Sequence, residues 1–257
     1  MSANRGGIFV PISNPDGVAP LLDLAFAATL AEEPAPNALV MVRRERGEAP
    51  PIPPHTSTFR AAMDFLRKRN STIAPQLVWT DDPAADIVRA AAEQGAAWIL
   101  MGSHRPVLTP DYRGGTVGEV LTKAAEAQIN VAVLIYGPAQ PRERLVAVVD
   151  YSSEGEAAME ISVRTALGRQ CQMRTLMVPR DRSEPDLELL EMVKQAGKRL
   201  GRRPKTDVLT ERSAARLAHQ TPGSIVVISS RLTDHLGLPV DSARGDSRRV
   251  LVVHSAR

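Results

Sequence analysis

The 257-residue chain is short of aromatic residues and cysteine, and both shortages limit its class. Phe, Trp and Tyr make up 4% of the residues, so the core has to be built mainly from Ala, Val, Leu, Ile and Met. Cys171 has no second cysteine with which to form an intrachain disulfide or a zinc cluster, which suits a reducing compartment. Apolar residues make up 43% of the chain, enough for one large domain or two ordinary ones.

Long hydrophobic runs and a strong net charge are missing too. No run approaches the roughly 20 apolar residues that span a bilayer, and the N-terminus lacks the apolar stretch of a signal peptide. We therefore expect a cytoplasmic polypeptide. The net charge is only +3, and basic clusters come without interleaved aromatics, so no nucleic-acid partner is expected. Residues 1–141 carry 12 Lys+Arg and 14 Asp+Glu, whereas residues 142–257 carry 20 and 15.

What the chain does have is short apolar runs that alternate with longer helical patterns. In the first half, strands are predicted at residues 7–13, 38–44, 74–80, 97–102 and 130–136, and helices at 18–33, 59–70, 82–95 and 116–128. Asp82 followed by Pro83 is typical of a helix start, so an N-cap is favoured there over a metal site built from Asp81 and Asp82.

A polar, proline-containing segment at 137–144 interrupts the series, which then starts again. Strands are predicted at 144–150, 172–178, 205–210, 224–230 and 248–255, and helices at 152–169, 186–201 and 211–220, with no clear helix over 231–247. We predict two tandem α/β domains, 1–141 and 142–257, each a doubly wound parallel sheet. Ligands bind at the carboxyl ends of the strands in such sheets.

The segment MGSHRPVLTPDYRGGTVGEV (101–120) is the strongest candidate site. An apolar run ends in Gly102, a loop follows, and glycines 114 and 115 precede a helical pattern. Glycines let the backbone approach a ligand closely, and the N–H groups and dipole of a helix N-terminus favour an anion. The pattern predicts a phosphate site.

The first half resembles the universal stress protein family through IFVPIS, DDPAADIVRAAAEQGAAWILMGSH and GGTVGEVLTKAAEAQINVAVLIY, over most of residues 7–136. The resemblance implies a Rossmann-like, adenine nucleotide alpha hydrolase-like fold. It also implies that the first strand ends near adenine, and that a loop of the form Gly-x-x-Gly, nine residues, Gly-Ser/Thr surrounds ribose and phosphates. Duplicated domains of this kind pack as a pseudo-dimer through their last strands, here 130–136 and 248–255.

The resemblance assigns an ATP or AMP site, with no metal required, by position. Around the base it places Pro11, Ile12, Ser13, Val40, Met41 and Val42, and around the phosphates Gly102, His104, Arg105, Gly115, Thr116 and Val117. Two of these depart from the family pattern: Arg105 replaces the second glycine, and Ser13 replaces an Asp. Arg105 either donates to a phosphate or fills the pocket. Gly118 stands where the family often has a hydroxyl.

The second half resembles the family more faintly. It has the strand-end acid, Asp150, but no Gly-x-x-Gly follows residues 224–230. Asp150 either meets a ligand or simply ends a strand beside the next helix, and the second alternative is favoured. Catalysis is not expected, because His104 has no nucleophile or carboxylate partner that the sequence places.

The opening VPISNPDGVAPLLDLAFAAT, with its Asn-Pro, is similar to the tandem stress-protein modules at the cytosolic end of bacterial cation/proton antiporters. The resemblance implies a regulatory module that binds a nucleotide and acts on a transporter membrane domain at the inner face of the membrane. The alternative is a free-standing tandem stress protein that acts through protein interactions without nucleotide. A nucleotide-hydrolysing enzyme is the least favoured reading. Dimerisation through the last strands is expected.

Overall fold

A computed structural model describes most of the chain, in two compact units. The described residues are 6–43, 56–103, 113–135, 144–179, 187–201, 204–210, 213, 224–236 and 249–256. The first unit comprises the described residues up to Gly102, residues 113–131 and Ala256. The second comprises Ser103 and the described residues from Ala132 to Ser255. The domain boundary at residues 141 and 142 stays a prediction.

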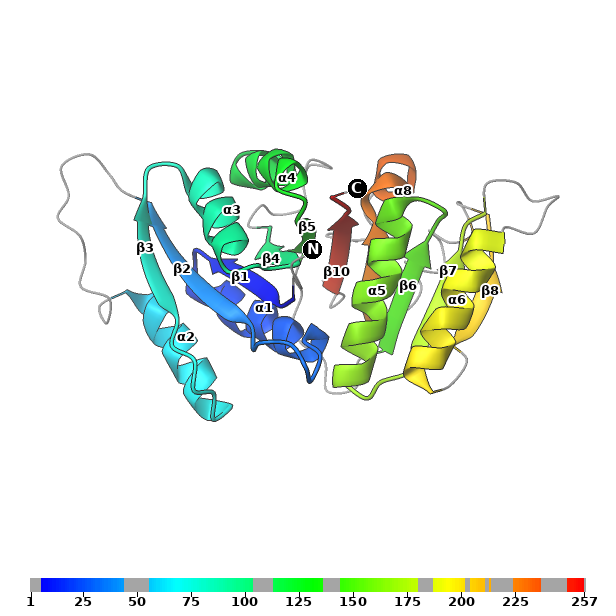
Figure 1. Cartoon of the computed structure of the whole chain (residues 1–257), viewed down its shortest axis with the longest axis horizontal. Coiled ribbons are helices and arrows are strands. Elements are labelled where there is room, and N and C mark those ends of the chain that lie inside the picture. Colours follow the sequence, from blue (N-terminus) through cyan, green and yellow to red (C-terminus); the bar gives the residue numbers. More distant parts are fainter. Residues whose placement is uncertain are drawn as a thin grey trace, which may run out of the picture. The chain divides into compact units, whose positions relative to one another are not determined.

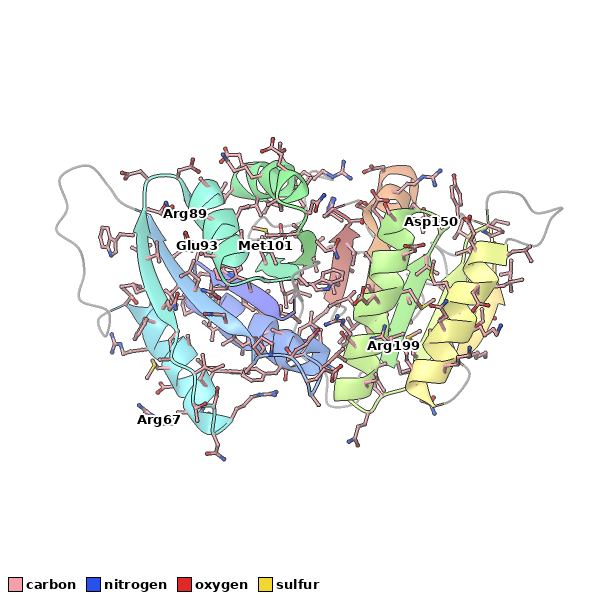
Figure 2. The ribbon with its side chains drawn as sticks, in the orientation of Figure 1. Arg67, Arg89, Glu93, Met101, Asp150 and Arg199 are labelled. Atoms are coloured by element: carbon pink, nitrogen blue, oxygen red, sulfur yellow. The ribbon has the colours of Figure 1, made fainter. Side chains whose placement is uncertain are left out.

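Four parallel strands form the sheet of the first unit, in the order β3-β2-β1-β4 (Figure 1). Their bounds are Ile8–Ile12 for β1, Asn37–Arg43 for β2, Gln76–Thr80 for β3 and Trp98–Gly102 for β4. All five residues of β1 and of β4 are buried, Met101 among them (Figure 2). Such continuous apolar runs are typical of parallel strands covered on both faces.

Helices α1 (Pro15–Ala28), α2 (Ser57–Lys68), α3 (Pro83–Glu93) and α4 (Thr116–Glu126) connect and follow these strands. Right-handed crossovers place α1 and α2 on one face of the sheet and α3 and α4 on the other, in line with the contacts within each pair. The predicted cap is confirmed, since Asp82 Oδ1 accepts from Ala85 N at 3.0 Å. Helix α1 starts three residues before the predicted position because Asn14 caps it, accepting from Gly17 N.

The second unit has the strand order β5-β10-β9-β6-β7-β8. Their bounds are Asn130–Ile135 for β5, Arg144–Val149 for β6, Met173–Met177 for β7, Lys205–Val208 for β8, Ser224–Ser229 for β9 and Arg249–His254 for β10. The pairs β6–β7, β7–β8, β6–β9 and β9–β10 are parallel. The packing of the two repeats as a pseudo-dimer stays a prediction.

Helices α5 (Ser153–Gly168), α6 (Leu187–Leu200) and α8 (Ser230–Leu236) belong to the second unit. Helix α8 lies where the sequence gives no clear helix, because seven residues are too few for a periodic apolar pattern. It starts directly after β9, where Ser229 Oγ accepts from Leu232 N at 3.4 Å. The helix predicted at 211–220 lies outside the described residues except for Ser213. Of the helices in the described ranges, none has the length and hydropathy needed to cross a bilayer.

Candidate functional site

The order of the strands in the first unit reverses between β1 and β4. The chain moves from β1 to β2 and β3 on one side, and then returns to place β4 on the other side of β1. Open α/β sheets bind ligands at the carboxyl ends of the strands beside such a reversal. Ile8 pairs with Trp98 and Phe9 with Ile99, so the same register continued places Ile12 level with Gly102. The structure therefore brings the ends of β1 and β4 to one edge.

The start of the predicted phosphate loop lies inside the protein. Gly102 is buried at the end of β4, and Ser103 is buried beside it, with its N–H donating to the Leu134 carbonyl at 3.0 Å. His104 and Arg105 were also assigned to this loop, but they lie outside the described residues.

The end of the loop is the N-terminus of α4, and a glycine stands at its N-cap. Gly115 precedes the helix with φ of 63° and ψ of −140°, a conformation that side chains rarely adopt. Side chains cap α1, α2, α3 and α5, whereas Gly115 has no side chain that could cap α4. Thr116 is exposed and Val117 is buried. The first-turn N–H groups of α4 thus start without the side-chain acceptor that the other four helices have.

Gly118 has a structural reason for being glycine. A Cβ at this position would lie 2.1 Å from the Arg113 carbonyl oxygen. The last turn of the loop therefore packs directly against the first turn of α4.

The residues assigned to the base lie mostly in the core. Pro11, Ile12, Val40 and Met41 are buried, Val42 is half-buried and Ser13 is exposed. Ile12 pairs with Val40 across β1 and β2, which places these residues at the same end of neighbouring strands. Surface for a ligand at this edge comes from Ser13, Val42 and the backbone, because the other four side chains pack inward.

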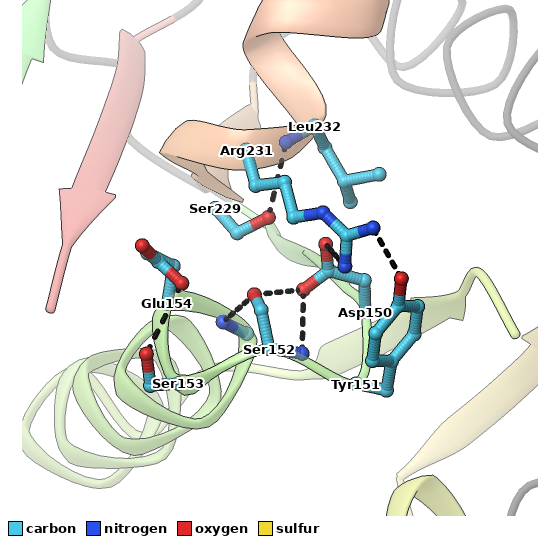
Figure 3. A network of polar contacts seen from close by, with 9 residues as sticks. Asp150, Tyr151, Ser152, Ser153, Glu154, Ser229, Arg231 and Leu232 are labelled. Carbon is cyan, nitrogen blue, oxygen red and sulfur yellow. Dashed lines mark hydrogen bonds and ion pairs between the residues drawn. The ribbon is translucent and has the colours of Figure 1, made fainter. Parts of the chain in front are cut away.

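The second unit reverses its strand order between β6 and β9, and there its own side chains form a network (Figure 3). Asp150 follows β6 and is only 2% exposed. Its Oδ1 accepts from Ser152 Oγ at 2.5 Å and from Ser152 N at 3.2 Å. Its Oδ2 lies 3.9 Å from Nη1 of Arg231, a residue of α8. The buried carboxylate is thus satisfied within the protein.

Arg231 is held by an aromatic ring as well as by charge. Its guanidinium carbon lies 4.3 Å from the centroid of the Tyr151 ring, and Nη2 donates to the Tyr151 hydroxyl. That hydrogen bond and, less strongly, the charge of Asp150 raise the pKa of Arg231 above its ordinary value. Arg231 is therefore a permanent cation bound to its own chain at the position where a ligand of the second unit would be expected.

Tyr151 and Arg231 were not predicted from the sequence. The signal was weak: Tyr151 directly follows Asp150, and Arg231 comes two residues after β9. Only the pairing of β6 with β9 brings these two strand ends together. Asp150 lies directly after its strand and beside the next helix, and Ser152, the residue it contacts, caps α5.

The described ranges contain no group of three His, Cys, Asp or Glu side chains arranged as metal ligands. In the pair Asp81–Asp82, the second carboxylate is used locally as the cap of α3.

These features define an α/β protein with the fold of the universal stress proteins. The chain is similar to the cytoplasmic domain of a prokaryotic cation chloride cotransporter, with a TM-score of 0.60 and 11% identity over 98% of this chain and 96% of that one. It is also similar to a universal stress protein from Archaeoglobus fulgidus (TM-score 0.52, 14% identity, 96% of each chain). A third similar structure is that of a protein described as a putative universal stress protein from Pseudomonas aeruginosa (TM-score 0.57, 15% identity, 97% of this chain and 93% of that one). No protein-family model and no curated protein sequence matches the chain.

Proposed function

We propose that the chain is a regulatory module of the universal stress protein type. Its first unit binds an adenine nucleotide, ATP or AMP, at the edge formed by the ends of β1, β2 and β4 and the start of α4. The bound state then alters the activity of an ion transporter in the membrane, a cation/proton antiporter by the resemblance of the N-terminal sequence. The proposal includes no catalytic step and no metal.

The observation that carries the nucleotide proposal is the start of α4. Gly115 adopts a left-handed conformation with no side-chain cap, next to the strand reversal between β1 and β4. Backbone N–H groups and the helix dipole stabilise a phosphate at such a position. Ser13 and Val42 offer surface at the neighbouring strand ends for the base.

The transporter part is supported by a solved structure. The similarity to the cytoplasmic domain of a prokaryotic cation chloride cotransporter extends over 98% of this chain. This part is tested by the coding sequence upstream of Met1. A reading frame that continues into apolar helices of about 20 residues would support it, and an in-frame stop codon directly upstream would contradict it.

Calorimetric titration with ATP, AMP and cyclic dinucleotides tests the nucleotide part. We expect micromolar binding of an adenine nucleotide that Gly115→Asp abolishes, because a carboxylate there would repel the phosphate. Gly95→Asp is the matched control: Gly95 has the same φ of 63° and open space around it, but it follows the end of α3. Loss of binding in both variants would point to misfolding rather than to a site.

Arg105→Gly separates the two roles that the sequence leaves open for this residue. Weaker binding in this variant would mean that Arg105 contacts the phosphates. Tighter binding would mean that it restricts entry.

The second candidate function is a module that acts through protein contacts and holds no nucleotide. The observations that favour it are Arg105 and Ser13 in place of the glycine and the Asp of the family pattern. No heat with any nucleotide, together with an unshifted melting temperature, would establish this candidate over the first.

A further inference from the structure

Two strands lie at the open ends of the strand order, β3 in the first unit and β8 in the second. Among the described strands, β3 pairs only with β2, over residues 76–80, and β8 pairs only with β7 (Figure 1). The outer side of an edge strand carries backbone N–H and C=O groups that can pair with another chain. The residues of the two edge strands show how the protein treats these groups.

The edge strand β8 carries charges that oppose pairing with another chain. Two of its four residues, Lys205 and Asp207, are charged. Asp207 accepts a hydrogen bond from Arg174 of the neighbouring strand β7 at 2.8 Å, so its charge is used inside the sheet. A short strand with a lysine is a usual protection of an exposed edge. We therefore expect no other chain to add at β8.

The edge strand β3 has no such charge. Its five residues are QLVWT, of which Gln76 is exposed, Leu77, Val78 and Trp79 are half-buried and Thr80 is buried. Beyond the ladder with β2, none of them makes a backbone hydrogen bond to another described segment. Both edge strands directly follow a proline, so the difference between them lies in charge. An uncharged, largely apolar edge invites a partner strand.

The sequence of β3 is compatible with a second copy of itself. In an antiparallel pair centred on Val78, Leu77 faces Trp79 of the partner subunit and no like charges meet. Pairs of an aromatic and an aliphatic side chain stabilise antiparallel strands. Alternate residues of an edge strand direct their backbone groups outward, and a pair centred on Val78 is symmetric for either set of residues. The register therefore satisfies the outward backbone groups of both copies.

We propose that two copies of the chain associate through β3, in an antiparallel pair with its twofold axis at Val78. The contact continues the sheet of the first unit into a second copy. A second copy fits better than an unrelated strand, because it supplies an uncharged strand of the same length and the twofold symmetry uses up both edges. Strand β10 does not offer such an edge, since β5 and β9 lie on its two sides.

This contact is separate from the proposed nucleotide site. It lies on the outer side of β3, whereas the nucleotide site lies at the strand reversal between β1 and β4. Its assay contains no nucleotide. A failure of one proposal therefore leaves the other standing.

Sedimentation equilibrium of the full chain tests the proposal. We expect a monomer–dimer equilibrium at protein concentrations up to about 100 μM. Val78→Lys places two like charges opposite each other at the twofold axis, so the dissociation constant of the dimer should rise at least about tenfold. Circular dichroism and thermal unfolding check that the variant folds. A monomer at every concentration, or an unchanged dissociation constant in Val78→Lys, would overturn the proposal.

Charge complementation locates the axis. Val78→Glu alone should also dimerise poorly, whereas a mixture of Val78→Lys and Val78→Glu should dimerise, because opposite charges then meet. The matched control is Thr206→Lys, which adds the same charge at a half-buried position of β8 and should leave the dimer intact. An equal loss in this control, or no gain on mixing, contradicts the proposal.

Cysteine cross-linking checks the register in a Cys171→Ser background, which removes the native thiol. Val78→Cys places two sulfurs across the axis, where paired Cα atoms lie about 4.5 to 5.5 Å apart, within the range of a disulfide. Gln76→Cys places them four residues apart along the ladder, about 13 Å, which a disulfide cannot span. We expect an intermolecular disulfide in the first variant and none in the second. Any other result would show that the copies do not pair in this register, and the proposal would be wrong.

Discussion

The two strand reversals of this chain have the same topology and opposite chemistry. In the first unit, the edge between β1 and β4 combines buried Gly102 with the uncapped start of α4, and Ser13 stands where an acid would be. In the second unit, the edge between β6 and β9 is occupied by Asp150 and Arg231, which contact each other and their neighbours. The first edge includes a helix start without a side-chain cap, whereas the second satisfies its own polar groups.

The comparison shows that a repeated fold does not repeat a site. Each unit has a glycine early in one helix beside its edge, at a position where a Cβ would meet a backbone oxygen. Gly118 makes room for the carbonyl of Arg113, and Gly155 for that of Asp150. Gly118 lies in α4, which follows β4, whereas Gly155 lies in α5, which follows β6, so each glycine is required by the backbone of its own loop.

The largest expected effect tests these two close approaches. Gly118→Ala and Gly155→Ala place a Cβ 2.1 Å and 2.2 Å from a backbone oxygen, which cannot move without shifting the loop. We expect each variant to lower the free energy of unfolding by about 3 kcal/mol, measured by urea denaturation. Gly95→Ala is the control, with a positive φ but open space, and should cost only about 1 kcal/mol. Similar losses in all three variants would show that backbone conformation, rather than close approach, decides.

A change at Arg231 tests whether the second edge is held by its own ion pair. Arg231→Met removes the cation facing a carboxylate that is 2% exposed, while it keeps an apolar stem on the Tyr151 ring. We expect a loss of about 2 kcal/mol. Asp150→Asn in the same background should restore part of it, which a double-mutant cycle measures. Strictly additive losses would mean that the two residues do not interact.

A pair of helix caps distinguishes the two edges more finely. Asn14 caps α1 by accepting from Gly17 N at 2.7 Å, and Ser152 caps α5 by accepting from Gly155 N at 3.1 Å. Ser152 also donates to Asp150. Asn14→Ala should cost about 1 kcal/mol, and Ser152→Ala about 1 kcal/mol more because a bond to a carboxylate is lost too. Thermal unfolding of both variants measures the difference, and equal costs would show that the bond to Asp150 contributes nothing.

The smallest effect concerns pH and the outer strands of the second unit. Arg174 Nε donates to Asp207 Oδ2 at 2.8 Å and lowers the pKa of Asp207. A lowered pKa in the folded state stabilises the protein above the unfolded pKa of about 3.9, and this stability disappears as the pH falls through the folded pKa. Asp207→Asn should therefore cost about 0.5 kcal/mol at neutral pH and almost nothing at strongly acidic pH.

An exposed pair of the first unit is the control for this pH effect. Asp64 lies 3.5 Å from Arg67, with side chains 63% and 75% exposed. Asp64→Asn should cost less than Asp207→Asn in the same series of urea denaturation experiments, because solvent screens this exposed pair. A pH-independent cost of Asp207→Asn would contradict the role given to its charge.

Much of the fold could be predicted because its signals are local. The buried strands 8–12 and 98–102 appear as continuous apolar runs, and Asp82 with Pro83 marks the start of α3. Helix α8 could not be predicted in this way. Its seven residues follow β9 without a break and have no periodic apolar pattern. The position of α8 is set by β9, which pairs with β6 and β10.

The candidate site was also predictable only where its features are local in the sequence. The sequence contains Gly102, Gly115 and Thr116 at a characteristic spacing. From that spacing we predicted where the loop ends and the helix starts. That Val40 and Ile12 would be buried together at the edge, leaving Ser13 and Val42 as its surface, depends on the register of β1 and β2. His104 and Arg105 stay predictions.

By itself the sequence determined the alternation of strands and helices, the glycines, and the acid at Asp150, because backbone conformation and hydrophobic periodicity act over a few residues. Only the tertiary structure decided that Arg231 meets Asp150 and that glutamates from α5 and α6 line one groove. Those contacts join residues about 80 and 30 positions apart. Strand order and helix packing bring these residues together, and neither can be predicted from a local sequence pattern.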